Sequence, residues 1–241
     1  NAGAAIATYA ARAGVPATIY VPSAVKESKL RAIRRAGAEV VRVDGTRADV
    51  TSACLDAVDA GAGWYASHAW NPAFFAGTAT MAYEIAHQSE WSTPDAVVLP
   101  VGHGTMFLGA YRGFKALLEA GWIDRMPKLL GAQAAGYAPI VEALHGSSAA
   151  TGENDAADGI RIREPVQKEA ILNAIADSGG DATAVSQSEP DEDLDRLHEA
   201  GFYTEPTCAV APAALRTFRQ EGGIEADDDV VVALSGSGLK T

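Results

Sequence analysis

Residues Asp95–Leu118 decide the fold, and they read DAVVLPVGHGTMFLGAYRGFKALL. The apolar run 96–101 predicts a buried strand, and a helical pattern begins directly after the Gly-His-Gly-Thr tetrapeptide at 102–105. Such a junction directs several main-chain N–H groups, and the positive end of the helix dipole, at one point. Because glycine has no Cβ, Gly102 and Gly104 let an anion approach the backbone. The stretch predicts a phosphate site, although an ordinary strand-to-helix turn explains it equally well.

Two common phosphate-binding loops do not fit this stretch. A Walker loop is excluded because no Gly-Lys-Ser/Thr follows the turn. The dinucleotide pattern G-x-G-x-x-G is incomplete because Phe107 occupies the position of its third glycine. A nucleotide-binding Rossmann domain is further disfavoured, since no acidic residue ends the strand that follows the helix.

Outward from this junction, strands and helices alternate along the chain. Strands are expected at residues 17–21, 39–43, 64–67, 96–101, 129–132, 182–186 and 230–234. Helices are expected at residues 4–14, 23–37, 46–60, 77–87, 105–118, 137–144, 166–177, 191–200 and 207–220, with a polar loop at 146–158. This alternation predicts an α/β fold whose parallel sheets are built from right-handed crossover units.

The best domain boundary lies near Asn71-Pro72. It gives a smaller α/β domain at residues 1–71 and a larger one at 72–241 that carries the glycine stretch. The first residues already read as a helix, so we expect the natural polypeptide to extend upstream and the smaller domain to be incomplete at its N-terminus.

Composition and charge limit the classes of function. The net charge of −12 disfavours binding to DNA or RNA, and no apolar run approaches the length of a membrane span. Acidic clusters such as 191–193 and 227–229 are read as solvated faces, with a high-salt cytoplasm as a weaker alternative. Cys54 and Cys208 are too few for a disulfide framework, so buried thiols in a reducing cytoplasm are expected.

No metal site is expected. The four histidines outside the glycine stretch share no ligand spacing and read as surface or packing residues: His68, His87, His145 and His198. His103 reads as a loop residue near the phosphate rather than an acid–base catalyst.

Five segments together resemble the fold-type II pyridoxal-phosphate enzymes, which include tryptophan synthase β, cysteine synthase, threonine dehydratase and threonine synthase. In chain order they are Asn1-Ala2-Gly3 with its helix, the stretch 100–114, the Gly-Ile-Arg-Ile segment 159–162, Glu205-Pro206-Thr207 and the LSGSGLK segment 234–240. The last three are closest to threonine synthases. The resemblance covers essentially the whole chain and implies two open, mostly parallel twisted sheets flanked by helices, with the N-terminal part missing.

The resemblance also implies roles for individual residues. Asn1 would bind the ring hydroxyl of pyridoxal 5'-phosphate, and Asn1 and Ala2 would begin the loop that grips the substrate carboxylate. The phosphate would be held by backbone N–H groups of Gly102, His103, Gly104, Thr105 and Met106. Ser235 would face the pyridine nitrogen, where a neutral hydroxyl need not keep that nitrogen protonated. Taken alone, Asn1 fits a helix N-cap and Ser235 fits a turn residue.

The family's Schiff-base lysine is expected upstream of Asn1, because no lysine of this chain occupies the matching position. A second departure lies at residues 68–74, read HAWNPAF, which match the Asn-Ser-x-Asn-Pro-x-Arg segment of threonine synthases. Asn71 and Pro72 are retained, but Phe74 replaces the arginine and Ala69 the serine. Phenylalanine cannot pair with a phosphate as a guanidinium does, which argues against phosphohomoserine as substrate. Thr105 and Met106 also depart from the residues common in the family.

We therefore expect a pyridoxal-phosphate-dependent lyase or synthase of the threonine synthase-like branch, acting on an amino acid by elimination or replacement. A serine/threonine dehydratase or a cysteine synthase-like enzyme is the alternative within the family. A non-catalytic binder of pyridoxal phosphate or another phosphometabolite, lacking the lysine, is the alternative outside catalysis. A cytoplasmic homodimer is expected from the resemblance.

Overall fold

The computed structural model describes residues 2–25 and 27–240. Main-chain contacts divide the chain into two compact units. The first comprises residues 2–68, and the second runs from Ala69 to Leu239. Both units contain parallel sheets flanked by helices, which confirms the predicted α/β fold class.

The first unit is a small two-stranded parallel layer with helices. Its elements are α1 (Ala2–Ala13), β1 (Thr18–Pro22), α2 (Glu27–Arg35), β2 (Glu39–Val43) and α3 (Arg47–Asp59). The strands pair in parallel, with Thr18 opposite Glu39. A small core of Ala7, Val21, Leu30 and Ile33 joins the sheet to its helices.

The strand predicted at Trp64–Ser67 is wrong. These residues form irregular backbone, and Trp64 is 79% exposed. Gly61 and Gly63 before them have positive φ angles, so the chain turns repeatedly here. In the described part of the chain no strand pairs with this segment, and β-structure needs such a partner.

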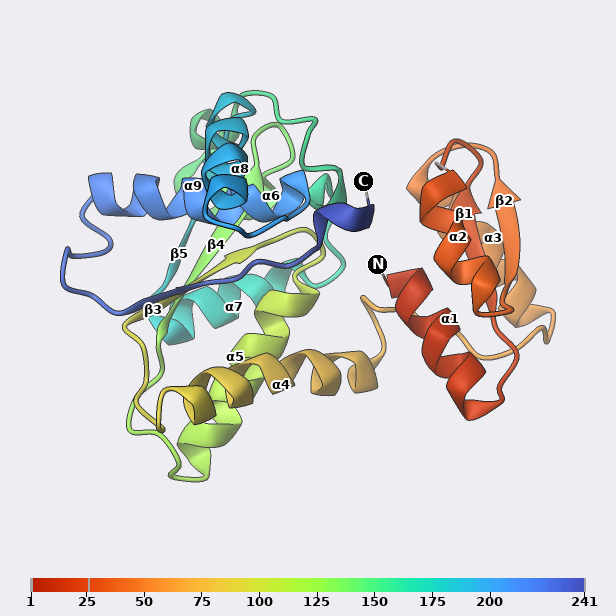
Figure 1. The fold of residues 1–241 in the computed structure, drawn as a ribbon, viewed down its shortest axis with the longest axis horizontal. Coiled ribbons are helices and arrows are strands. Elements are labelled where there is room, and N and C mark those ends of the chain that lie inside the picture. The colour runs from red at the N-terminus through yellow and green to blue at the C-terminus, as the bar shows by residue number, and fades with distance from the viewer. Residues whose placement is uncertain (1, 26, 241) are drawn as a thin grey trace. The chain divides into compact units, whose positions relative to one another are not determined.

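The second unit is built on one four-stranded parallel sheet (Figure 1). Its elements are α4 (Pro72–Gln88), β3 (Ala96–Pro100), α5 (Thr105–Glu119), β4 (Lys128–Ala134), α6 (Pro139–His145), η1 (Ser147–Ala150), η2 (Asp158–Ile160), α7 (Lys168–Ser178), β5 (Asp181–Val185), α8 (Ser188–Glu199), α9 (Pro206–Gln220), β6 (Val230–Val232) and η3 (Gly238–Lys240). The strand order is β5-β4-β3-β6, so the last strand of the chain lies beside β3.

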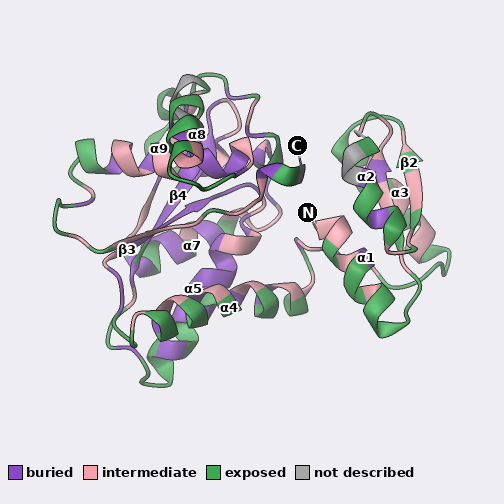
Figure 2. Ribbon diagram, in the orientation of Figure 1, coloured by how far each residue is buried: buried purple, intermediate pink, exposed green. Residues whose placement is uncertain are grey.

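Strand β3 is buried on both faces, as its unbroken apolar sequence requires (Figure 2). Val97 and Leu99 belong to the core that includes residues of α4, α5 and α7. Ala96 and Val98 point to the opposite face and join a second core with residues of α9. The sheet is thus covered by helices on both sides, which is the arrangement that a parallel sheet needs.

Helices α4 and α5 approach each other closely because α5 carries two glycines on the shared face. A Cβ on Gly109 would lie 2.1 Å from Thr78 Oγ1, and one on Gly113 would lie 2.5 Å from the carbonyl oxygen of Ala79. Thr78 also donates a 3.0 Å hydrogen bond to the carbonyl of Thr105, which ties α4 to the start of α5. Helix α4 begins at Pro72 rather than at the predicted residue 77.

The 159–162 segment, which resembles a family strand motif, is not a strand here. It contains the 3-10 turn Asp158–Ile160, followed by irregular backbone. Strands β3 and β4 already have neighbours on both sides, so neither has an open edge for this segment. The predicted polar loop 146–158 contains the 3-10 turn Ser147–Ala150. Among the described helices, none has both the length and the apolar character to cross a membrane.

Candidate cofactor site

The glycine stretch forms the predicted strand–turn–helix junction between β3 and α5. Gly104 is the N-cap of α5, with φ 77° and ψ 13°, a left-handed conformation that favours glycine. A Cβ at this position would also lie 2.4 Å from Cδ1 of Ile171. Within the described chain no side chain caps this helix, and its first turn carries no acidic residue. The helix start therefore presents main-chain N–H groups and a positive dipole end, with no acidic residue in its own first turn.

Gly102 is required by a different contact, which the sequence did not reveal. A Cβ on it would lie 3.1 Å from Cα of Ile160 and 3.3 Å from Cγ1 of Ile162. The 159–162 segment thus packs directly over the glycine turn. Gly159 N–H donates to Thr207 Oγ1 at 3.3 Å, so the start of α9 holds this covering segment in place.

Ser235 lies at the same edge of the sheet as the glycine stretch. Strands β3 and β6 are parallel neighbours, with Val98 opposite Val232, and Ala233 N–H continues the ladder to the Val98 carbonyl at 3.0 Å. Their carboxyl ends therefore lead into adjacent loops. The structure brings together Gly102, His103, Gly104, Thr105 and Met106 on one strand end and Ser235 on the next. Ligands of open parallel sheets bind at this edge.

The Ser235 loop is fixed by the start of α9. Gly236 N–H donates to Cys208 Sγ at 2.8 Å, and the Cys208 thiol reaches the Gly236 carbonyl at 3.1 Å. Cys208 Sγ also lies 3.5 Å from Ser235 Oγ, and Glu205 N–H donates to the Gly236 carbonyl at 3.1 Å. The sequence alone indicated only that Cys208 is a buried thiol. It is fully buried, whereas Cys54 is only partly buried.

The N-terminal candidates belong to the other unit. Asn1 lies outside the described residues, and Ala2 is the first residue of α1 in the first unit. Their roles toward the ring hydroxyl and the substrate carboxylate stay predictions.

The segment that departs from the threonine synthase pattern has structural roles in this fold. Asn71 Oδ1 accepts a 2.9 Å hydrogen bond from Ala73 N–H and caps α4. Ala69 is buried, and its carbonyl accepts from Gln167 Nε2 at 3.3 Å. Burial lowers the pKa of His68, so its imidazole is neutral near pH 7.

Among the described residues, no group of three His, Cys, Asp or Glu side chains is arranged to hold a metal ion.

Comparison with known proteins identifies the family of the chain. A family model described as "Pyridoxal-phosphate dependent enzyme" matches residues 1–236. Threonine synthases of Methanosarcina acetivorans and Methanocaldococcus jannaschii are each 35% identical over the whole of this chain. The chain spans about 60% of the length of these curated relatives.

Solved structures share the fold. Maize serine racemase matches 98% of this chain and 70% of its own, with a TM-score of 0.80 and 18% identity. The processed threonine deaminase isoform 2 of Solanum lycopersicum matches 98% of this chain and 63% of its own, with a TM-score of 0.81 and 21% identity. The chain therefore belongs to the pyridoxal-phosphate dependent enzyme family.

Proposed function

We propose that the complete protein is a pyridoxal-phosphate-dependent lyase of the threonine synthase type, acting on an amino-acid substrate by elimination or replacement. The observation that carries the proposal is the pairing of the glycine turn and Ser235 on adjacent strand ends of one parallel sheet. Similarity to threonine synthases along the whole chain supports the reaction class.

The glycine turn fits the phosphate of the cofactor. The start of α5 carries no side-chain cap or first-turn acid within the described chain, and glycine at 102 and 104 keeps the turn compact. The N–H groups of residues 102–106 would bind the phosphate dianion, aided by the helix dipole. The contacts of Ile160 with Gly102 and of Ile171 with Gly104 hold these groups in place before the cofactor arrives.

Ser235 fits a neutral partner for the pyridine nitrogen. When bound, the cofactor supplies a conjugated ring that draws electrons from the substrate's α-carbon. The Ser235 hydroxyl would donate a hydrogen bond to the ring nitrogen without carrying a charge, which gives a milder electron sink than a carboxylate partner. Cys208 and the N–H of Glu205 fix the loop that presents this hydroxyl.

Two further parts of the site complete the proposal. Asn1 and Ala2 would hold the ring hydroxyl and the substrate carboxylate, and the Schiff-base lysine would precede Asn1 in the complete protein. Phe74 supplies no guanidinium, so a phosphorylated substrate would need a different cation.

We also propose a cytoplasmic homodimer, on the basis of the family resemblance. Light scattering of the purified complete protein gives the oligomeric state. A mass of one chain would contradict the dimer.

The activity is tested on the complete protein reconstituted with pyridoxal phosphate. We expect a visible absorption band of bound cofactor, a change in that band with an activated homoserine whose leaving group needs no guanidinium partner, and release of threonine. A preparation that binds no cofactor would overturn the family assignment of the site. A preparation that binds cofactor but deaminates serine or threonine, and forms no threonine, would overturn the threonine synthase type and favour a dehydratase.

A further inference from the structure

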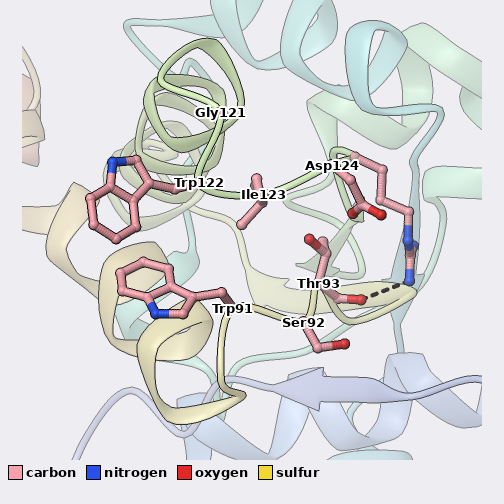
Figure 3. Close-up of a pocket in the computed structure, with 8 residues that line it drawn as sticks. Trp91, Ser92, Thr93, Gly121, Trp122, Ile123 and Asp124 are labelled. Atoms are coloured by element: carbon pink, nitrogen blue, oxygen red, sulfur yellow. Dashed lines mark hydrogen bonds between the residues drawn. The ribbon is translucent and has the colours of Figure 1, made fainter.

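A cavity lies at the opposite end of the sheet from the glycine turn. It is formed by Trp91-Ser92-Thr93, which lead into β3, and by Gly121–Arg125, which lead from α5 toward β4 (Figure 3). It is open to solvent and has a volume of about 420 Å³. Both segments precede strands, so the cavity lies at the amino ends of β3 and β4.

Two indoles form one wall of this cavity. The ring centroids of Trp91 and Trp122 are 4.6 Å apart with an interplanar angle of 42°, and His87 meets Trp91 edge-on at 5.8 Å. Trp122 is nevertheless 57% exposed, so a broad apolar face is available to a ligand.

The backbone that places Trp91 is strained. Glu90 and Trp91 have φ angles of 52° and 67°, the left-handed region that bulky side chains rarely adopt. They are the non-glycine residues with positive φ in the described chain. Strain of this kind persists where surrounding contacts impose it, and it concentrates at binding sites.

The polar lining of the cavity is incompletely satisfied. Thr93 is 6% exposed, and within the described chain its Oγ1 is a buried atom without a hydrogen-bond partner. In Figure 3 a side-chain oxygen of Thr93 and the carboxylate of Asp124 point into the space between the two segments. A buried hydroxyl without a partner costs free energy, so a ligand that bonds to it gains affinity.

Arg125 brings a cation to the same cavity. Its Nη2 donates to the Thr93 carbonyl at 2.7 Å and to Asp95 Oδ1 at 2.8 Å. Nη1 and Nε keep donors that no described residue accepts. The guanidinium is therefore fixed in position and still able to bind a carboxylate.

The charges of the cavity select the chemistry of its ligand. Asp124 and Arg125 line the cavity with opposite charges, so a simple anion would meet Asp124 and a simple cation would meet Arg125. A zwitterion satisfies both signs. We propose that this cavity binds a free α-amino acid, with its carboxylate on Arg125, its ammonium group on Asp124 and an aliphatic side chain against Trp122.

This site is independent of the cofactor site, since the two lie at opposite ends of the strands of one sheet. An amino acid bound here does not react. If the proposed function holds, it is a second amino-acid site of the protein, separate from the site of the reaction. Binding there would change the stability of the fold or the rate of the reaction.

The test uses the complete protein loaded with pyridoxal phosphate, and L-leucine as the probe. We expect saturable change in tryptophan fluorescence while the visible band of the cofactor stays unchanged. N-acetyl-L-leucine, which lacks the ammonium charge, and L-leucine amide, which lacks the carboxylate, should each bind about tenfold more weakly. If L-leucine causes no fluorescence change, or if N-acetyl-L-leucine binds as well as L-leucine, the proposal is wrong.

Two variants locate the response. Asp124→Asn should weaken L-leucine about tenfold, and Thr93→Val should weaken it severalfold while keeping the fold, because the hydroxyl has no protein partner to lose. Asp227→Asn, which changes an exposed acid elsewhere, is the matched control and should bind as the parent does. Equal L-leucine binding by Asp124→Asn and Asp227→Asn would overturn the proposal. Because the readout is fluorescence, failure of the proposed enzyme activity would not affect it.

Discussion

At the scale of single residues, Gly104 must be glycine for two reasons. Its backbone is left-handed, and it packs closely against Ile171. Gly179 shares only the first reason, since it has φ 61° and open space around it. An alanine at Gly179 measures the cost of a left-handed backbone alone. An alanine at Gly104 adds the cost of displacing Ile171 and the turn.

We predict that Gly104→Ala weakens binding of pyridoxal phosphate at least tenfold, because Ile171 and the first turn of α5 must both shift. Gly179→Ala should lower stability by about 1 kcal/mol and leave cofactor affinity unchanged. Titration of each complete variant with the cofactor, followed by absorbance, measures the two cofactor affinities. Equal cofactor affinities in the two variants would argue against a phosphate site at the start of α5.

Ser235 is tested by removing its hydroxyl or replacing it with a charge. Ser235→Ala should keep the cofactor and lower turnover about tenfold or more, as expected for loss of one hydrogen bond to a charged or polarised group. Ser235→Asp should raise the pKa of the ring nitrogen, because a nearby carboxylate favours the protonated form. The pH dependence of the bound cofactor's spectrum reports that change. A spectrum identical in all three proteins would place Ser235 away from the ring.

At the scale of elements, the contact between α4 and α5 depends on the absence of side chains on one face of α5. Gly113 has the Ala79 carbonyl and Ala82 Cβ within 2.7 Å of the position that a Cβ would occupy. Gly77 of α4 has no neighbouring atom within 4 Å of that position. The same substitution therefore has opposite effects in the two helices.

Gly113→Ala should destabilise the protein by about 1–3 kcal/mol through overpacking. Gly77→Ala should stabilise it by about 0.5–1 kcal/mol, because alanine loses less conformational freedom in a helix. Urea unfolding at equilibrium compares the two. If Gly113→Ala proved as stable as the parent, the close approach of α4 and α5 would be wrong.

Asp95 joins the beginnings of β3 and β6. Its Oδ2 accepts from Asp229 N–H at 2.9 Å, and Oδ1 accepts from Arg125. The Asp229 N–H, followed by Arg125, lowers the pKa of this carboxyl below its usual value. Its stabilising contribution is therefore present above the unfolded pKa of about 4 and is lost as pH falls through the lower folded pKa.

Asp95→Asn should thus be less stable than the parent near pH 7, with a gap that narrows below about pH 4. Denaturant unfolding at a series of pH values measures this gap. Asp227→Asn serves as the control, and a gap that stays constant down to acid pH would exclude the proposed role of Asp95.

At the scale of the whole molecule, much of the fold could be predicted from the sequence. Hydrophobic periodicity and the positions of the glycines indicate the same helices, strands and turns along the chain. The glycine stretch was located correctly, since its strand, turn and helix are contiguous in sequence. Trp64–Ser67 was misassigned because a short apolar segment looks like a strand whether or not a partner exists.

The contacts that complete the candidate cofactor site could not be read from the sequence. Ile160 packs on Gly102, Ile171 on Gly104 and Cys208 on the Ser235 loop, and each pair is distant in sequence. Periodicity reveals that such residues are apolar but not which turn they support. Only the fold of the second unit brings them together.

Cofactor binding should stabilise the whole protein if the proposed site exists. At a hundredfold excess over Kd, ligand that binds only the folded state adds about 2.7 kcal/mol to the free energy of unfolding. Pyridoxal without its phosphate should add much less, because the start of α5 then binds nothing. Thermal unfolding of the complete protein with each compound measures the difference, and equal stabilisation by both would contradict the phosphate cradle.

The position of β6 has a consequence for biogenesis. This strand is translated after every other strand of the sheet, yet it takes the place beside β3, the first strand of its unit. During synthesis the glycine turn is therefore made well before Ser235, and both belong to the proposed site. Until β6 is made, the edge of β3 that it covers lacks its partner strand.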